Sequence, residues 1–300
     1  MKQRVTKIFK KELNEVPLSV MEIAGYGTVN SVFMVACQSV NYVIRLNEEE
    51  GKHLEFIKEE WCINEARKAG VPSPIVIANG VFEGTVYMIQ EQLEGVNGST
   101  CSKKDKELIW EYMGRYASKY HRIKDIAIPA LKEAEFHDDW GSKLAYNINQ
   151  LNADDSLLLS DALNPAAHTD IRRILISLRE KDFDFGLIHG DLSPRNTIVN
   201  ASSTYLIDWG TASVNVVPHN EIGILLMEGE VGKKEFLAFL KGMGASEQEY
   251  REMELEVWKL NLLHRLDKYR WATDYKIEDL MDFTMKVKKS YEKVVKLETR

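Results

Sequence analysis

The sequence is poor in cysteine and contains no long apolar run. Cys37, Cys62 and Cys101 are its only cysteines among 300 residues, they lie far apart, and none forms a C-x-x-C pair. An odd number of scattered thiols suggests neither a disulfide framework nor a thiolate zinc site. No window approaches the roughly 18 apolar residues of a membrane helix, and the N-terminus lacks the apolar segment of a signal peptide. We therefore expect a cytoplasmic protein with no membrane partner.

The sequence also lacks an excess of positive charge. Its 39 Lys and Arg residues face 46 Asp and Glu residues, which gives a net charge of -7. This balance argues against a protein that binds a duplex by neutralising its phosphates, so we expect no nucleic acid partner. No internal repeat or low-complexity tract is visible, which leaves a solenoid unsupported. None of the seven histidines belongs to an H-E-x-x-H motif, which is typical of zinc sites.

The chain does have the length and apolar content of a large globular protein. Its 300 residues predict two domains, or one domain of two lobes, because single hydrophobic cores rarely grow beyond about 250 to 300 residues. Hydrophobic residues make up 44% of the sequence and charged residues 28%. This composition provides enough apolar surface for a large core, so we expect a folded and soluble chain.

The first third of the sequence combines strand-like and helical patterns. Helical spacing of apolar residues covers 4–15 and 52–69, and β-rich runs cover 18–24, 29–36, 42–46, 75–77 and 86–90. We predict that the last two runs are joined by a turn containing Gly80 and Gly84. The pattern predicts an N-terminal lobe over residues 1–94, with an antiparallel β-sheet and one main helix.

A Gly-rich stretch over 95–99 lacks periodicity, and we place the boundary between the lobes there. Helical patterns follow over 104–123, 139–151, 169–181 and from 220 onward, around a β-rich island at 186–209. The second lobe, 95–300, is therefore predicted to be mostly helical. The fold class that we predict is α+β with two lobes.

The segment that carries the most chemical information reads LIHGDLSPRNTIV over 187–199 and YLIDWG over 205–210. A loop between two short apolar strands presents Asp191 and, five residues later, Asn196, while Asp208 follows the next strand. Their three oxygen donors can converge on one small volume. Carboxylate and amide oxygens suit Mg²⁺, and an Asp that the metal does not use can orient a hydroxyl and accept its proton.

These residues resemble the catalytic elements of kinases. Asp191 to Asn196 has the D-x-x-x-x-N spacing of the protein-kinase catalytic loop, and the D-W-G that begins at Asp208 stands where those kinases have D-F-G. With Gly190 in place of the kinase Arg, the form H-G-D-x-x-x-x-N followed by I-D-W is similar to the aminoglycoside phosphotransferase and choline kinase-like family of small-molecule kinases. The resemblance implies a bilobal protein-kinase-like fold.

The resemblance also implies a role for individual residues. It makes Asp191 the catalytic residue and Asn196 and Asp208 the Mg²⁺ ligands. The nucleotide-binding residues that it implies lie in the first lobe: Gly25, Gly27, Asn30 and Ser31 in a flap hairpin, Arg45 in place of the kinase Lys on the third strand, Glu59 as its partner, and Glu91 and Leu93 at a hinge near 91–94. Glu60, one residue on, is the alternative partner of Arg45.

Two other nucleotide-binding motifs are excluded. A strand rather than a helix follows the G-Y-G, which argues against a Rossmann fingerprint, and no G-x-x-x-x-G-K-[ST] of a Walker A loop occurs.

The function implied by the resemblance is an ATP- or GTP-dependent O-phosphotransferase that moves the γ-phosphoryl group to a hydroxyl of a small molecule. Its expected partners are Mg²⁺, a nucleoside triphosphate and a small hydroxylated acceptor, and the chain is expected to be a monomer or homodimer. The acceptors considered are aminoglycosides and related antibiotics, choline, ethanolamine, sugars, amino acids and macrolides. A nucleotide-binding pseudokinase that acts as a sensor or scaffold is the alternative, and metal-dependent hydrolysis is a third hypothesis.

Further predictions concern residues outside these motifs. Glu221 stands where the family usually has an Asp, and we expect it to brace the catalytic loop. We expect His189 to pack and hydrogen-bond behind that loop, and His121 to be a core or capping residue. Trp258, His264, Asp267 and Trp271 lie at helical spacings that are more typical of core than of substrate-binding residues.

Overall fold

The computed structural model describes residues 1–23, 30–49, 51–124, 128, 134–159, 163–228, 231–275, 277 and 279–300. Gly25 and Gly27 lie outside the described residues. The chain packs as two compact units. The first consists of Met1–Ile109, Ile128–Leu131 and Pro194–Ala212, and the second of Trp110–Ala127, Lys132–Ser193 and Ser213–Arg300. Among the described residues, no helix is both long enough and apolar enough to cross a bilayer.

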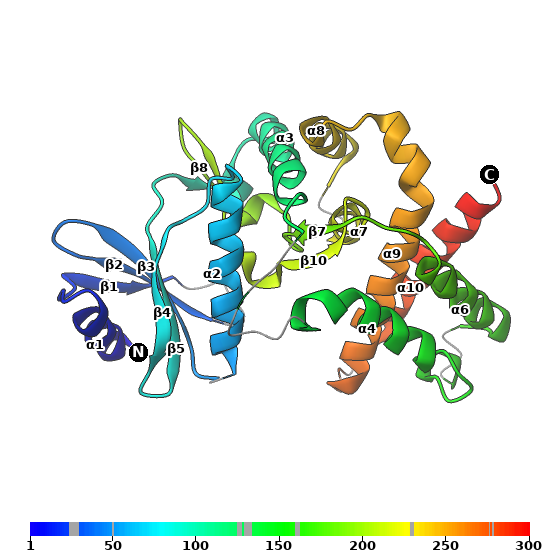
Figure 1. The fold of residues 1–300 in the computed structure, drawn as a ribbon, viewed down its shortest axis with the longest axis horizontal. Helices are drawn as coiled ribbons and strands as arrows, with labels where there is room; N and C mark the ends of the chain where they lie inside the picture. The colour runs from blue at the N-terminus through cyan, green and yellow to red at the C-terminus, as the bar shows by residue number, and fades with distance from the viewer. Residues whose placement is uncertain are drawn as a thin grey trace. The chain divides into compact units, whose positions relative to one another are not determined.

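A five-stranded antiparallel sheet dominates the first unit (Figure 1). Its strands are β1 (Ser19–Glu22), β2 (Ser31–Ala36), β3 (Asn41–Asn47), β4 (Val76–Phe82) and β5 (Thr85–Glu91), in the order β1-β2-β3-β5-β4. Phe33, Ile44 and Ile89 lie in register across three strands and are completely buried. Because side chains alternate between the faces of a strand, Arg45 lies on the opposite face from Ile44.

One helix packs on each face of this sheet. The helix α1 (Lys2–Glu12) buries Val5, Ile8 and Phe9 in the same cluster as Phe33 and Ile44. The helix α2 (Lys52–Lys68) contributes Phe56 to a separate cluster with Val86 and Met88 of β5. Arg45 pairs with Met88 in the sheet register, so its side chain lies on the α2 face.

The turn between β4 and β5 is tighter than the sequence predicts. Glu83 and Gly84, both with positive φ, form the turn, whereas Gly80 lies inside β4 opposite Tyr87. A Cβ at position 80 would lie 2.8 Å from the phenol oxygen of Tyr87. The prediction was therefore correct for Gly84 and wrong for Gly80, where glycine makes room for a tyrosine on the neighbouring strand.

The first unit also contains the second half of the D-x-x-x-x-N loop and the D-W-G segment. A small sheet has the order β6-β8-β9, and short 3-10 turns lie beside it. Its elements are β6 (Val96–Asn97), η1 (Gly98–Thr100), η2 (Pro194–Asn196), β8 (Thr197–Val199), β9 (Thr204–Leu206) and η3 (Trp209–Thr211). Within the stretch 95–99, which lacks periodicity in the sequence, Val96 and Asn97 thus form a strand that pairs with β8.

The second unit is mostly helical, as predicted. The helix α3 (Lys103–Tyr120) begins in the first unit, and the further helices are α4 (Ala134–Gln150), α5 (Ser156–Leu159), α6 (Pro165–Arg179), α7 (His219–Glu228), α8 (Lys233–Met243), α9 (Glu247–Asp274) and α10 (Met281–Glu298). An antiparallel pair, β7 (Phe185–Ile188) and β10 (Ser213–Val216), accompanies them. α9 packs against α10 and α7 (Figure 1). The core includes Ile171, Leu175, Leu260, Leu263 and Val287.

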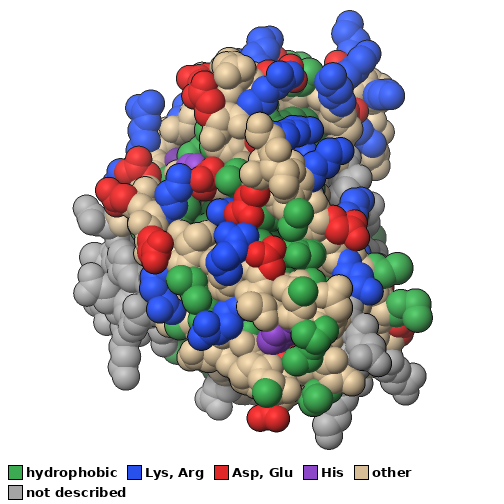
Figure 2. All heavy atoms as spheres, turned by 90° about the vertical axis from the view of Figure 1, so that its right-hand side faces the viewer, with side chains coloured by type: hydrophobic (Ala, Val, Ile, Leu, Met, Phe, Trp, Pro, Cys, Tyr) green, Lys and Arg blue, Asp and Glu red, His purple; other side chains and the backbone are tan. Residues whose placement is uncertain are grey.

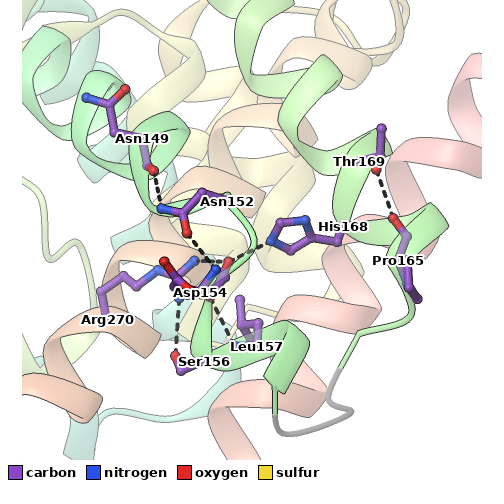
Figure 3. A network of polar contacts seen from close by, with 10 residues as sticks. Asn149, Asn152, Asp154, Ser156, Leu157, Pro165, His168, Thr169 and Arg270 are labelled. Carbon is purple, nitrogen blue, oxygen red and sulfur yellow. Dashed lines mark hydrogen bonds and ion pairs between the residues drawn. The ribbon is translucent and has the colours of Figure 1, made fainter.

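A buried ion pair joins α9 to the segment that leads into α5. Both terminal nitrogens of Arg270 donate to the carboxylate of Asp155, with Nη2 2.7 Å from Oδ2. The same carboxylate lies 2.9 Å from Nε2 of His168 and accepts the N-H of Leu157 at 3.0 Å. Figure 3 shows Arg270 and His168 converging on this segment. The side chain of Asp155 is completely buried, so these four contacts replace its hydration.

The surface of the second unit mixes charges of both signs. Figure 2 shows Lys and Arg side chains interspersed with Asp and Glu on one face. Several opposite charges on the helices are paired, for example Arg173 with Glu298 at 2.7 Å and Lys293 with Glu254 at 2.7 Å. The two charges of each such pair neutralise each other locally.

Candidate active site

Arg45 of β3 forms a buried ion pair with Glu59 of α2. Its Nη1 donates a hydrogen bond to Oε1 of Glu59, and only 14% and 1% of the two side chains are exposed. The ring of Phe56, one turn before Glu59, lies 5.3 Å from the guanidinium carbon, which adds a cation-π contact. The guanidinium is therefore held from two positions on one helix.

The charge of this cation is stabilised by its neighbours. Burial alone would lower the pKa of Arg45, but the carboxylates of Glu59 and Asp208 outweigh burial and raise that pKa above its usual value. Glu60, the alternative partner, instead accepts a hydrogen bond from Nδ2 of Asn79, and burial raises the pKa of its carboxyl. The structure thus places Glu59, and not Glu60, in contact with Arg45.

Asp208 lies beside the same guanidinium, with Oδ1 3.8 Å from Nη2 of Arg45. Its backbone is left-handed, at φ 63° and ψ 66°, a conformation that Asp adopts more readily than most residues. The next residue, Trp209, is completely buried and donates from Nε1 to Oγ of Ser73 at 3.3 Å. The chain therefore turns at Asp208, so that Trp209 fills the core while 53% of the Asp208 side chain stays exposed.

Asn196 ends η2 and is almost fully buried. Its carbonyl accepts the N-H of Ile207 at 3.0 Å, which ties it to the residue before Asp208. On the other side, Nδ2 of Asn97 donates to the carbonyl of Arg195 at 2.7 Å. The structure thus links the segments that carry the two predicted metal ligands, Asn196 and Asp208.

The contribution of Asn97 was not predicted from the sequence. Gly95 and Gly98 flank the strand β6 that carries it, and neither position has room for a side chain. A Cβ at position 95 would lie 2.5 Å from the carbonyl oxygen of Val199, and one at position 98 would lie 2.2 Å from Oγ1 of Thr197. The two glycines allow β6 to approach the loop closely, and their spacing is the signal that could have indicated Asn97.

The other predicted nucleotide-binding residues lie at strand ends of the first unit. Oδ1 of Asn30 accepts a hydrogen bond from Nδ2 of Asn47, at the end of β3, at 2.8 Å. Ser31 begins β2 and pairs with Leu46. The structure thus brings Asn30 and Ser31 to the end of the strand that carries Arg45.

Glu91 and Leu93 lie at the end of β5 and just beyond it. Oε1 of Glu91 accepts the N-H of Ile75 at 2.9 Å and lies 3.8 Å from Nη1 of Arg67. The N-H of Glu91 donates to the carbonyl of Ile75 at 3.0 Å. The N-H and one carboxylate oxygen of Glu91 are thus engaged within the first unit, while the partly exposed Leu93 follows two residues later.

Asp191 lies in the second unit, after β7, and its loop is braced by Glu221 of α7. The two carboxylate oxygens of Glu221 accept the N-H groups of His189 at 2.9 Å and Gly190 at 3.1 Å. Burial acts to raise the pKa of Glu221, but His121 and His189 outweigh it and keep that pKa below its usual value. The predicted bracing role of Glu221 is confirmed.

The two predicted core histidines lie around this brace. His189 is completely buried, and its Nδ1 accepts the N-H of Asp191 at 3.3 Å. Nε2 of His121 lies 3.6 Å from Oε2 of Glu221, and the residue is 9% exposed. Both predictions are confirmed.

The residues on α9 that the sequence singled out for their helical spacing differ in their exposure. His264 is partly buried, and the pKa of its imidazole is lowered to about 3 because burial disfavours the charged form. Its Nε2 bonds Oδ1 of Asn220. Trp271 is 51% exposed and packs against the ring of Tyr275 at 5.0 Å, so the expectation of a core role was wrong for Trp271. Asp267 pairs with Lys143 at 3.2 Å.

The sequence profile of the APH phosphotransferase enzyme family matches residues 23–255. The chain belongs to this family. The predicted family and the enzyme class, a small-molecule kinase, are thereby confirmed. Among curated proteins, none matches the chain.

Solved structures share its fold over nearly the whole length. Aminoglycoside phosphotransferase APH(4)-Ia has a TM-score of 0.73 at 16% identity, covering 97% of this chain and 99% of its own. A thermostable mutant of that enzyme forms a ternary complex with AMP-PNP and hygromycin B. The GDP complex of aminoglycoside 2'-phosphotransferase-IIIa has a TM-score of 0.70 at 14% identity, and the match covers 97% of this chain and 98% of its own. A putative fructosamine-3-kinase from Haemophilus somnus has a TM-score of 0.65 at 12% identity, and the match covers 98% of this chain and 97% of its own. These similarities confirm the bilobal, kinase-like α+β fold.

Proposed function

We propose that this chain is an ATP- or GTP-dependent O-phosphotransferase that moves the γ-phosphoryl group to a hydroxyl of a small molecule. The observation that carries the proposal is the buried Arg45-Glu59 pair beside the half-exposed carboxylate of Asp208. A guanidinium fixed by one carboxylate still has donors for phosphate oxygens. In this proposal residues 1–94 bind the nucleotide, and 95–300 hold the catalytic loop and the acceptor.

The residues present fit a magnesium ion. Asn196 offers an amide oxygen and Asp208 a carboxylate oxygen, and the hydrogen bond from Ile207 to Asn196 joins their segments. Mg²⁺ prefers such hard donors and usually takes one or two protein ligands together with waters and phosphate oxygens. When bound, it would neutralise charge on the nucleotide phosphates, while Arg45 would bind their remaining oxygens.

Asp191 is proposed to orient the acceptor hydroxyl and to accept its proton. In the transfer, the bond between the γ-phosphorus and the bridging oxygen of the nucleotide breaks as the acceptor oxygen bonds to phosphorus, and the nucleoside diphosphate leaves. Such a reaction depends mainly on alignment and charge neutralisation, so no covalent enzyme intermediate is needed. Three hydrogen bonds of the loop support the assignment, because the N-H of Asp191 bonds His189 and Glu221 accepts the two preceding amides.

The complexes of the structural neighbours guide the choice of donor and acceptor. AMP-PNP and GDP, bound by two of them, support testing both ATP and GTP. Hygromycin B and the fructosamine kinase indicate hydroxylated molecules that also carry amines, so aminoglycosides and glycated amines head the acceptor panel.

The experiment measures consumption of ATP and of GTP across a panel of hydroxylated metabolites and antibiotics, with and without Mg²⁺. The expected result is turnover that requires both Mg²⁺ and one class of acceptor, with a product heavier by one phosphoryl group. Nucleotide binding without transfer to any acceptor would instead favour the pseudokinase. Nucleotide consumption that no acceptor stimulates would favour hydrolysis.

A further inference from the structure

Tyr120, the last residue of α3, makes a buried hydrogen bond that the site described above does not explain. Its hydroxyl donates to Oε2 of Glu221 at 2.8 Å, and neither side chain is more than 1% exposed. The phenol ring also lies edge-on to the imidazole of His121, with centroids 5.1 Å apart. A hydrogen bond to a charged group is strong where water is excluded.

The carboxylate of Glu221 is shared between the loop and α3. Its Oε2 accepts both the Tyr120 hydroxyl and the N-H of His189, while Oε1 accepts the N-H of Gly190. The two amides belong to the loop itself, so they fix the loop and the carboxylate relative to each other but not relative to α3. A glutamate side chain has three rotatable bonds, and a donor outside the loop is required to fix its orientation. Tyr120 is such a donor.

The end of α3 is itself fixed against the strand that leads into the loop. A Cβ at Gly186 would lie 2.0 Å from the carbonyl oxygen of His121, so the two backbones are in direct contact. The N-H of Leu187 donates to the carbonyl of Ile123 at 3.0 Å. The Tyr120 hydroxyl therefore has a defined position relative to β7.

We infer that Tyr120 is a positioning residue for phosphoryl transfer, which orients Glu221 and, through it, the His189-Gly190 backbone that presents Asp191. The catalytic part of this inference rests on the proposed function. Tyr120 acts through Glu221 and contacts neither nucleotide nor acceptor in this scheme. The phenol is the donor and the carboxylate the acceptor, because burial and Glu221 raise the pKa of Tyr120 far above its usual value while that of Glu221 is lowered.

The substitution that tests the inference is Tyr120→Phe, which removes one oxygen and preserves the buried ring. The matched control is Tyr291→Phe, because the hydroxyl of Tyr291 also donates to a carboxylate, that of Asp170 at 3.1 Å, on other helices of the same unit. Amide hydrogen exchange of a peptide covering 187–191 gives a measurement that needs no activity. Tyr120→Phe should increase exchange of the His189 and Gly190 amides by about tenfold, and Tyr291→Phe should leave it unchanged.

Kinetics with an accepted substrate provide the second measurement. Tyr120→Phe should lower kcat by about 10- to 100-fold and leave the KM for nucleotide within about twofold, since the variant misplaces Asp191 only. The titratable groups that face Glu221 are Tyr120, His121 and His189. Loss of the phenol donor should raise the pKa of Glu221, so the acid limb of the kcat profile should move to higher pH. In a Glu221→Gln background, Tyr120→Phe should lower kcat much less than it does in the wild-type chain.

Unchanged loop exchange in Tyr120→Phe, or an equal change in Tyr291→Phe, overturns the inference. So does wild-type kcat in Tyr120→Phe when the wild-type chain transfers phosphate. A wild-type chain that transfers phosphate to no acceptor contradicts the proposed function instead, and the exchange experiment then still decides whether Tyr120 positions the loop.

Discussion

Oδ1 of Asp208 lies 3.8 Å from Nη2 of Arg45, while the other terminal nitrogen of that guanidinium bonds the buried Glu59. The two carboxylates differ in exposure, 53% for Asp208 and 1% for Glu59. Glu59 is therefore committed to holding Arg45, whereas Asp208 is accessible to a ligand from solvent. This asymmetry separates the effects expected from substitutions at the three positions.

Arg45→Ala should lower kcat/KM by about 10² to 10³-fold, because a preorganised cation is lost from the phosphates. It should also destabilise the fold by about 3–5 kcal/mol, since Glu59 becomes an unpaired buried charge. Arg45→Lys should recover part of the activity. A double variant, Arg45→Met with Glu59→Gln, removes the uncompensated charge and should recover stability without activity. Thermal unfolding and kinetics on the same samples check this, and full kcat/KM in Arg45→Ala would make Arg45 a bystander.

Asp208→Asn and Asn196→Ala should each weaken binding of the magnesium nucleotide by about tenfold or more, because each alters one oxygen donor. Asn tolerates the left-handed conformation of position 208, so Asp208→Asn changes charge without adding backbone strain. Calorimetry with nucleotide, in the presence and absence of Mg²⁺, measures the effect. The metal assignment fails if both variants bind and turn over nucleotide as the wild type does.

Asn97→Ala should weaken the same binding by a few-fold, less than Asn196→Ala. It removes the hydrogen bond to the Arg195 carbonyl, which loosens the backbone before Asn196 but leaves both proposed oxygen ligands of the metal in place. Asn152→Ala is the matched control, since that side chain also donates to a carbonyl, that of Asn149 at 2.8 Å, in a turn of the second unit. Equal calorimetric affinities for Asn97→Ala and the wild type would show that Asn97 does not support the metal site.

Strand and helix periodicity in the sequence predicted the two elements that carry Arg45 and Glu59. Alternation along β3 puts Ile44 and Arg45 on opposite faces, and the helix 52–69 was expected beside it. The resemblance to kinases implied Glu59 as the partner of Arg45 and left Glu60 as the alternative. Neighbouring residues on a helix point about 100° apart, and only packing decides which one faces the sheet. The observed pair, Arg45 with Glu59, depends on how α2 lies on β5.

The missed residues share one property, which is distance along the chain. Asn97 bonds a residue 98 positions away, and Tyr120 bonds one 101 positions away. Such contacts arise from tertiary packing, and no local pattern identifies the bonded partner, although the glycines on either side of β6 indicate a close approach there. Trp271 was misjudged for a related reason, since helical spacing identifies a shared face but not which end of that face extends beyond the core. The roles of Asp191, Asn196, Asp208 and the nucleotide-binding residues stay predictions that the experiments above and below test.

Arg270→Leu should destabilise the second unit by about 3–5 kcal/mol, because it leaves the completely buried Asp155 carboxylate without its cation. The matched control Arg173→Ala breaks two partly exposed pairs, with Asp170 and Glu298, and should cost less than about 1 kcal/mol. Burial acts to raise the pKa of Asp155, but Arg270, the N-H of Leu157 and His168 together outweigh it and lower that pKa. The pair therefore stabilises the fold above about pH 4, and this contribution is lost as the pH falls through the lowered pKa. Denaturant unfolding between pH 2 and 7 measures both effects, and equal losses in the two variants would contradict the buried-pair interpretation.

Asp191→Asn should separate proton acceptance from nucleotide binding. The amide keeps the shape of the side chain and removes its basic oxygen, so kcat should fall by about 10² to 10⁴-fold. Affinity for the magnesium nucleotide should stay within about twofold of the wild type, because the proposed ligands of the metal are Asn196 and Asp208. Asp208→Asn provides the contrasting case, since it should weaken nucleotide binding as well as turnover.

Both quantities should be measured on each variant, with nucleotide affinity from calorimetry and turnover at saturating nucleotide, Mg²⁺ and a confirmed acceptor. Hydrogen exchange over 187–191 should match the wild type in Asp191→Asn, because the Glu221 brace bonds the preceding amides and not the Asp191 carboxylate. A loss of kcat with intact exchange and intact nucleotide affinity then has to come from the carboxylate itself. Near-normal turnover in Asp191→Asn would refute the proposed mechanism, and it would do so without affecting the family or the fold.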